Sequence, residues 1–172
     1  MTSTTYSASE QLRDGRSIEI RALRVEDEAG MLAAIDRTGQ QSLQRRFFVT
    51  KRGFSDKEKA FFMNVDFVNH VALVAEIDES GKRTIIGGGR YIVVEPGEAE
   101  VAFVVVDAYQ GQGIGGLLTR HLVGLARAAG LKQLLADVLP ENVAMRNVLD
   151  KFGFRTARSL DPQVVHLVLP LT

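Results

Sequence analysis

The stretch Gln110-Gly111-Gln112-Gly113-Ile114-Gly115-Gly116 lies between an apolar run at residues 101–106 and a long amphipathic pattern that begins at Ile114. A glycine-rich turn exposes its backbone N–H groups, because no side chains stand in front of them. Where a helix begins inside such a turn, its unpaired N–H groups and the positive end of its dipole converge on one point. The stretch therefore predicts a seat for a phosphate-bearing ligand.

The composition indicates a globular protein without nucleic-acid, membrane or metal partners. The chain has 172 residues, enough to bury a core, and its 21 Lys and Arg balance its 21 Asp and Glu, so no basic surface points to nucleic acid. Without cysteine there are no disulfides and no thiolate ligands. No apolar run approaches the roughly 18 residues of a membrane span, and no signal-peptide pattern opens the chain. We therefore expect a cytoplasmic protein.

The N-terminal part is predicted to be a loose lead-in followed by a strand and a helix. Residues 1–9 are polar and without periodicity, and Asp14-Gly15 marks a turn. We therefore take residues 1–15 as the lead-in and assign one domain to residues 16–172. Residues 17–24 alternate polar and apolar, as a half-buried strand does. The acids at 26–28 suit the first turn of a helix, which Gly39 would end.

Two more helices are expected before residue 70, and strands after it. Residues 43–48 have helical spacing, and Ser55–Glu58 spells a capping box. Three apolar runs with short turns between them predict an antiparallel meander at residues 71–77, 84–94 and 98–106. Gly87-Gly88-Gly89 inside the second run indicates a bulge or a close approach of backbones.

The C-terminal part predicts a parallel crossover. Apolar residues recur at steps of three and four from Ile114 to Ala129, and Gly130 would close this helix before a strand at 132–139. Asn142 opens another helix that Gly153 ends, and two strands, 154–157 and 164–169, complete the chain. The predicted fold class is α/β with one mixed sheet, antiparallel first and parallel later, and helices on both faces.

Two other phosphate-binding motifs resemble the glycine turn in part. Gly111, Gly113 and Gly116 satisfy the dinucleotide pattern G-x-G-x-x-G, and Asp137 lies about 20 residues on, where a ribose-binding acid belongs. That motif should follow the first strand directly, however, whereas several strands precede this one and too few residues remain for a doubly wound sheet. The nucleotide-triphosphate loop requires Lys before Ser or Thr, and Gly116-Leu117 lacks both.

The wider pattern resembles the GNAT superfamily of N-acetyltransferases. It consists of an apolar strand, Asp107, Gln110-x-x-Gly113-x-Gly115, an amphipathic helix, a strand, Asn142 and then Phe152-Gly153-Phe154. The resemblance extends from about Arg16 to the end of the chain and is densest between residues 98 and 154. It implies the acyl-CoA N-acyltransferase fold and a site for acetyl-CoA.

The resemblance also implies roles for particular residues. Backbone amides of Gly111, Gln112, Gly113, Ile114, Gly115 and Gly116 would hold the pyrophosphate. The strand end Val104, Val105 and Val106 would splay from residues 132–139 and bind the pantetheine as an added strand does, with an amide near Val105 holding the developing oxyanion. Asn142 would contact the coenzyme, cap its helix, or do both.

An amine acceptor requires a base, because a lysine-like amine with a pKa near 10.4 is almost all ammonium at pH 7. Glu100 stands where many members of the superfamily place a carboxylate base, with Glu98 as the substitute. The tyrosine that usually serves as general acid, seven residues after the asparagine, is replaced here by Leu149. We therefore expect the CoA thiol to leave as a thiolate or to take its proton from water. His70, His121 and His166 are expected to be structural.

The N-terminal half is more loosely similar to bacterial protein-lysine acetyltransferases, through Asp14-Gly15, Glu26-Asp27-Glu28, Arg45-Arg46-Phe47-Phe48 and Val65-Asp66-Phe67. This implies a lysine on a protein as the acceptor. Two alternatives stay open: acetylation of a small-molecule amine, and a CoA-binding sensor without turnover. Whether the chain forms a homodimer is also left open.

Overall fold

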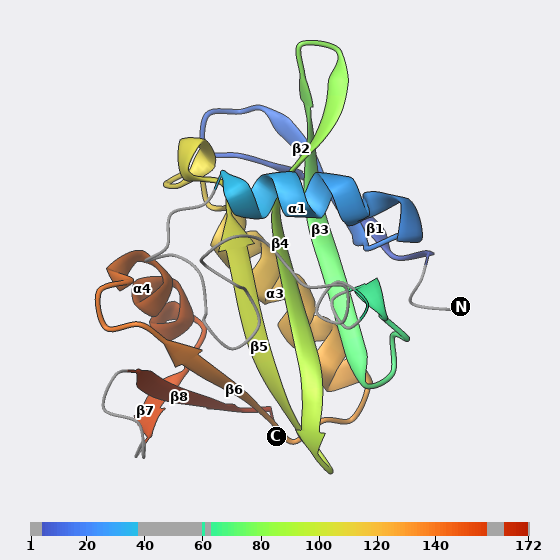
Figure 1. Ribbon diagram of the computed structural model, residues 1–172. Coiled ribbons are helices and arrows are strands. Elements are labelled where there is room, and N and C mark those ends of the chain that lie inside the picture. Colours follow the sequence, from blue (N-terminus) through green and yellow to red (C-terminus); the bar gives the residue numbers. More distant parts are fainter. Residues whose placement is uncertain (1–4, 38–59, 61–62, 158–163, 172) are drawn as a thin grey trace.

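The computed structural model describes residues 5–37, 60, 63–157 and 164–171, and eight strands in these ranges form one sheet in the order β1-β2-β3-β4-β5-β6-β8-β7 (Figure 1). The strands are β1 (Ser7–Gln11), β2 (Ser17–Ala22), β3 (His70–Glu79), β4 (Lys82–Glu95), β5 (Glu98–Val105), β6 (Gln133–Val138), β7 (Arg155–Ala157) and β8 (Val165–Pro170). β5 and β6 are parallel, and the other pairs are antiparallel. This confirms the predicted mixed sheet.

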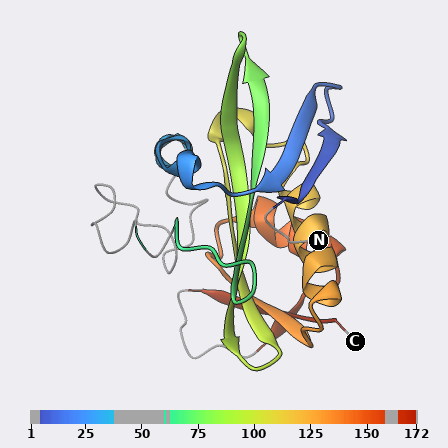
Figure 2. The ribbon, with the colours of Figure 1, turned by 90° about the vertical axis from the view of Figure 1, so that its right-hand side faces the viewer.

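Helices cover both faces of this sheet, as Figure 2 shows in edge view. They are α1 (Glu28–Asp36), α3 (Ile114–Ala128) and α4 (Val143–Lys151). The glycines of β4 identify the faces, because a methyl group on Gly88 would meet Met31 of α1 whereas one on Gly89 would meet Leu122 of α3. α3 connects β5 to β6, so the predicted parallel crossover is confirmed.

The expected loose lead-in is wrong for residues 7–11. This segment forms β1, which pairs antiparallel with β2 from Ser7 opposite Arg21 to Gln11 opposite Ser17. Its sequence, Ser-Ala-Ser-Glu-Gln, has little apolar character, so no periodicity marks it. The strand is held instead by the backbone ladder of β2 and by Glu10, which bonds to Arg120 and His121 of α3.

The first helix also begins differently from the prediction. Residues 25–27 form a 3₁₀ turn, and α1 begins only at Glu28 and ends at Asp36, before the expected stop at Gly39. Asp27 does not serve the helix dipole alone, because it is buried against Arg21 of β2. The helices predicted at 43–48 and from Ser55, and Gly39 itself, lie outside the described residues.

The glycines of β4 confirm both features that were expected of them. Ala75 of β3 pairs with Gly87, but Glu76 pairs with Ile85, so Ile86 is an extra residue in a bulge directly before the glycines. A methyl group on Gly88 would lie 3.2 Å from the carbonyl oxygen of Leu73, and one on Gly89 would lie 3.0 Å from the Phe103 ring. Side chains at these positions would therefore separate the strands or push α3 away.

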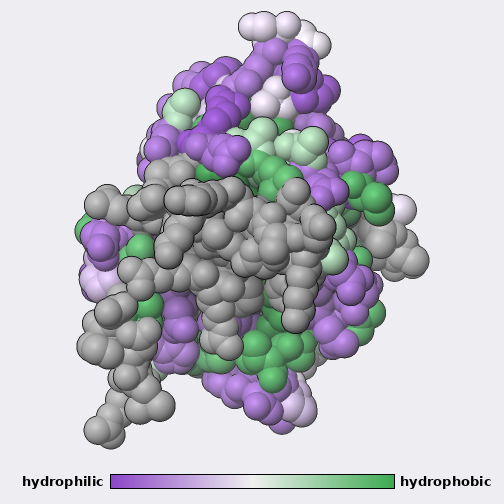
Figure 3. All heavy atoms as spheres, in the orientation of Figure 1, coloured by the Kyte–Doolittle hydropathy of each residue, from purple (hydrophilic) through white to green (hydrophobic). Residues whose placement is uncertain are grey.

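Apolar side chains fill the space between the sheet and its helices. The fully buried ones include Ile20, Leu73, Ile86, Leu118, Leu122 and Leu134. Figure 3 views the face of α1 and shows hydrophilic residues gathered at the tip of the β3–β4 hairpin, which carries Asp78, Glu79, Lys82 and Arg83. Within the described ranges, no helix combines the length and the apolar character needed to cross a bilayer.

Candidate functional site

The site begins where β5 and β6 separate. Their parallel pairing covers Glu98, Ala99 and Glu100 opposite Gln133, Leu134 and Leu135, and it does not continue beyond Glu100. The rest of β5, from Val101 to Val105, stays paired with β4 alone. The two strands therefore open into a V, as predicted, and no strand among the described residues continues the pairing along the edge of β5 that faces β6.

The glycine turn stands at the end of β5 and begins α3. A 3₁₀ turn at Asp107–Tyr109 follows the strand, and Gly113 is the N-cap of α3 with φ +92°, in the left-handed region that favours glycine. No side chain caps the N–H groups of the first helical turn. These donors and the positive end of the α3 dipole are therefore available to an anion.

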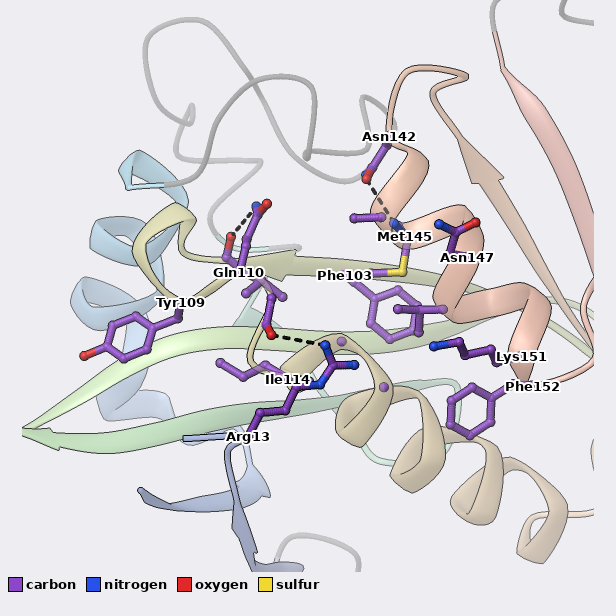
Figure 4. A pocket seen from close by; sticks show the side chains of 17 residues that line it. Arg13, Phe103, Tyr109, Gln110, Ile114, Asn142, Met145, Asn147, Lys151 and Phe152 are labelled. Atoms are coloured by element: carbon purple, nitrogen blue, oxygen red, sulfur yellow. Dashed lines mark hydrogen bonds between the residues drawn. The ribbon is translucent and has the colours of Figure 1, made fainter. Parts of the chain in front are cut away.

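A cleft of about 340 Å³ lies along this turn, between the end of β5, α3 and α4 (Figure 4). It is lined by Arg13, Phe103, Val105, Tyr109, Gln110, Gly111, Gly113, Ile114, Gly115, Gly116, Asn142, Ala144, Met145, Asn147, Val148, Lys151 and Phe152. Most of the predicted ligand-binding residues are thus brought together. Among the described residues, the lining contains two cations and no carboxylate, which suits a polyanionic ligand with an apolar arm.

Three of the predicted residues, Gln112, Val104 and Val106, do not line the cleft. Gln112 faces the β1–β2 turn, where its carbonyl accepts the N–H of Arg13 at 3.1 Å. The valine side chains are buried. The N–H of Val106 donates to Ile86 of β4 at 2.9 Å, and since backbone groups alternate along a strand, that of Val104 also faces β4.

Val105, between these two, is directed the other way. Its backbone faces the V, and its carbonyl accepts Nε2 of Gln110 at 3.3 Å (Figure 4). Its side chain lines the cleft. Of the three valines, Val105 therefore has the geometry that the added-strand hypothesis requires.

Glu100 lies at the apex of the V, as the last β5 residue paired with β6. Its side chain is only 4% exposed and shares a sheet face with that of its β4 partner Ile92, the face that α1 covers. Phe103 and Val105 have the opposite parity and face the cleft. The V is thus an opening between the two faces of the sheet, and Glu100 lies at its apex.

Glu98, the substitute base, is less well placed. It lies two residues before Glu100, roughly 7 Å farther from the opening along the strand. Its carboxylate accepts a hydrogen bond from Nε2 of Gln133 on β6. The structure therefore favours Glu100 of the two.

Asn142 lies at the N-terminus of α4, where its side chain accepts the N–H of Met145 at 3.2 Å (Figure 4). The helix-capping prediction is confirmed, and the same side chain also lines the cleft. Met145 and Val148 bring α4 onto the first turn of α3, since a methyl group on Gly115 would lie 3.3 Å from Met145 Cε.

No tyrosine occupies the position of a general acid. Leu149 is fully buried in the core. Among the chain's three tyrosines, only Tyr109 lines the cleft, and Figure 4 shows its ring directed away from it. The Tyr109 hydroxyl donates to Glu79 of β3. Burial, reinforced by this carboxylate, raises the pKa of Tyr109, so its hydroxyl stays protonated.

The three histidines have structural partners, as expected. His121 bonds to Glu10 of β1 at 2.6 Å, His166 bonds to Asp137 at 2.5 Å, and Nε2 of His70 lies 2.8 Å from Nη1 of Arg90. Burial, together with the positive charge of Arg90, lowers the pKa of His70 to about 4. His70 is therefore neutral at physiological pH. The Asp137–His166 contact also gives Asp137 a role other than binding a ribose.

Neither of the two cations of the cleft was predicted from the sequence. Arg13 belongs to the β1–β2 turn, inside the supposed lead-in, and nothing local connects it with a glycine turn nearly 100 residues away. Lys151 could have been found, because it lies at helical spacing from Ala144 and Val148 on the α4 face that lines the cleft.

Comparisons with known proteins agree with this geometry. A model of the acetyltransferase (GNAT) family matches residues 39–154. The chain is 34% identical over 160 residues to an acetyltransferase from Pseudomonas aeruginosa, an alignment that covers 91% of this chain and 86% of the relative. It is 31% identical over 147 residues to the acetyltransferase Pat from Mycolicibacterium smegmatis, covering 83% of this chain but only 43% of that longer relative.

Among solved structures, the GNAT domain of S. lividans PAT superposes with a TM-score of 0.83 at 32% identity, over 95% of this chain and 96% of that domain. The yncA protein of Salmonella typhimurium, solved with its cofactor acetyl-CoA, has a TM-score of 0.72 at 18% identity over 90% of this chain and 94% of that one. The latter likeness is one of fold.

Proposed function

Because the chain belongs to the acetyltransferase (GNAT) family, we propose that it transfers an acetyl group from acetyl-CoA to a primary amine, with a lysine on a protein as the acceptor. One observation carries the proposal: the V between β5 and β6 opens directly after Glu100, beside a cleft that ends at the uncapped N-terminus of α3. A thioester in the V would lie between the N-terminus of α3, where the pyrophosphate would bind, and the carboxylate of Glu100.

The residues present fit acetyl-CoA. The first turn of α3 offers N–H donors to the pyrophosphate, in a cleft without carboxylates. The backbone of Val105 faces the V, where it would pair with the amides of the pantetheine arm. Met145 and Val148 supply an apolar wall, and Asn142 a polar group, along α4.

The transfer step needs a free amine and a stabilised oxyanion. Acetyl-CoA supplies an activated acyl group when it is bound. Glu100 takes one proton of the acceptor ammonium, directly or through a water, and the neutral amine attacks as its new C–N bond replaces the C–S bond. The nitrogen then gives its extra proton to water, which leaves the neutral amide. The N–H of Val105 donates to the carbonyl oxygen while negative charge develops on it. With Leu149 at the usual acid position, CoA leaves as a thiolate that takes its proton from water.

The lysine acceptor is supported by the loose resemblance of residues 12–75 to bacterial protein-lysine acetyltransferases. A panel of acceptors tests it. We expect free CoA thiol to be released with lysine peptides and not with polyamines or aminoglycosides. Thermal unfolding is followed in parallel, and acetyl-CoA at 100 times its Kd should stabilise the protein by about 2.7 kcal/mol.

The outcomes of this panel are distinct. Release with the small amines alone would reassign the acceptor. Stabilisation by acetyl-CoA without release by any acceptor would indicate a CoA-binding sensor. No stabilisation at millimolar acetyl-CoA would contradict the whole proposal.

The missing general acid predicts the shape of the pH profile. A tyrosine acid would lose its proton, and its function, at alkaline pH, whereas here only the base and the acceptor amine titrate. We expect kcat/KM to keep rising with pH up to about pH 9.5, with no alkaline decline, because the amine is still mostly protonated below its pKa of about 10.4. A bell-shaped profile, in a protein shown by circular dichroism to stay folded at pH 9.5, would contradict a thiolate leaving group.

A further inference from the structure

Two cations face the cleft without a carboxylate partner. Arg13 and Lys151 are exposed and line the cleft, and neither makes an ion pair within the ranges that the structure describes. By contrast, Arg16 and Arg155, their nearest basic neighbours in the sequence, are paired with Asp14 and Asp150. In a chain with equal numbers of acidic and basic residues, the described part of the cleft thus has an excess of positive charge.

The two cations flank the first turn of α3 from opposite sides (Figure 4). Arg13 is fixed against the glycine turn, because its N–H donates to Gln112 at 3.1 Å and its Nη1 donates to the carbonyl of Gly111 at 3.2 Å. Lys151 stands on the other wall, at the C-terminal end of α4 and roughly 9 Å along that helix from Met145. A single phosphate at the N-terminus of α3 would therefore have Arg13 as its neighbour.

Coenzyme A has two separate anionic groups, the pyrophosphate and the 3′-phosphate of its ribose. On the basis of the proposed function, we propose that each of the two cations binds one of these anionic groups. Arg13 binds the pyrophosphate together with the glycine turn, and Lys151 binds the 3′-phosphate. The planar fork of arginine suits the neighbouring oxygens of a pyrophosphate, and the point charge of lysine suits a terminal phosphate. The cleft then distinguishes CoA from 3′-dephospho-CoA.

Calorimetric titrations with CoA and with 3′-dephospho-CoA test this division. The wild-type protein should bind CoA about two- to fivefold more tightly, the range of one exposed charge pair. Lys151→Met should remove this preference, because it should weaken the binding of CoA but not that of 3′-dephospho-CoA. Lys151→Arg should retain the preference. Arg13→Met should weaken both ligands by the same factor and leave the preference intact.

Lys82→Met and Arg127→Met are matched controls, because both residues are exposed and lie outside the cleft. They should change neither affinity. Equal binding of the two ligands by the wild-type protein would overturn the inference, as would a Lys151→Met variant that loses both affinities equally, or an Arg13→Met variant that binds both normally. If the wild-type protein bound neither ligand, that result would instead contradict the proposed function itself.

Discussion

Glu100→Gln is expected to lower kcat about 10²- to 10³-fold while leaving the Kd of acetyl-CoA unchanged. The amide cannot accept the proton of the acceptor ammonium, and general-base catalysis contributes this much. Affinity should survive because Glu100 lies on the α1 face of the sheet, opposite the side chains that line the cleft. Steady-state thiol release and calorimetric titration of acetyl-CoA measure the two quantities.

Glu98→Gln is the matched control. Glu98 has the same side chain on the same strand and face, but it lies two residues farther from the opening and is bonded to Gln133. We expect near-normal kcat for this variant. If Glu98→Gln lowered kcat as much as Glu100→Gln, or if Glu100→Gln turned over normally, Glu100 would not be the base.

Arg21→Met is expected to lower the free energy of unfolding by about 3–5 kcal/mol, the usual effect of removing one partner of a buried ion pair. Arg21 is buried on β2, where it donates to Asp27 at 2.8 and 2.9 Å and to Glu76 of β3 at 3.0 Å. The substitution would leave the carboxylate of Asp27 buried and without its guanidinium. Urea unfolding followed by circular dichroism measures the change.

Arg155→Met is the control for this variant. Arg155 and Asp150 form a pair 3.7 Å apart whose side chains are more than 70% exposed, so its loss should cost less than about 1 kcal/mol. Similar losses of stability in the two variants would show that burial is not what makes Arg21 important.

The same cluster predicts how stability depends on pH. The hydrogen bonds from Arg21 lower the pKa of Glu76 despite its burial; for Asp27, burial raises the pKa but the bonds from Arg21 and Arg24 outweigh it and lower it overall. A carboxyl with a lowered pKa stabilises the folded state above its unfolded value, near pH 4, and the contribution is lost as pH falls through the folded value. The stability difference between wild type and Arg21→Met should therefore shrink below about pH 4.

Much of the region around the glycine turn could be predicted from the sequence. The glycines, the apolar stripe of α3 and the Asn142 cap each depend on residues within one or two helical turns of one another. Their patterns can therefore be recognised in a single stretch of sequence. The division into strands was also predicted, and so was the bulge in β4, because alternation and glycines mark them locally.

Other features of the fold could not be predicted from local sequence patterns. β1 forms because its backbone pairs with that of β2 and because side chains of α3 bond to Glu10. Neither contact can be predicted from a pentapeptide with little apolar character. Asp27 suited a helix dipole in the sequence, yet its partner is Arg21 on a neighbouring strand. The start of α1 depends on that contact as well as on the acids around it.

The sequence by itself determined the family, the mixed sheet and the glycine turn at Gly111–Gly116 from which α3 begins, because each rests on short-range spacing. Only the tertiary structure decided that Glu100 stands at the apex of the V, that Val105 rather than its neighbours faces the opening, and that Arg13 reaches the glycine turn. Those three facts depend on strand register and on contacts between distant segments. The packing of the whole sheet fixes them, and no local pattern of residues encodes them.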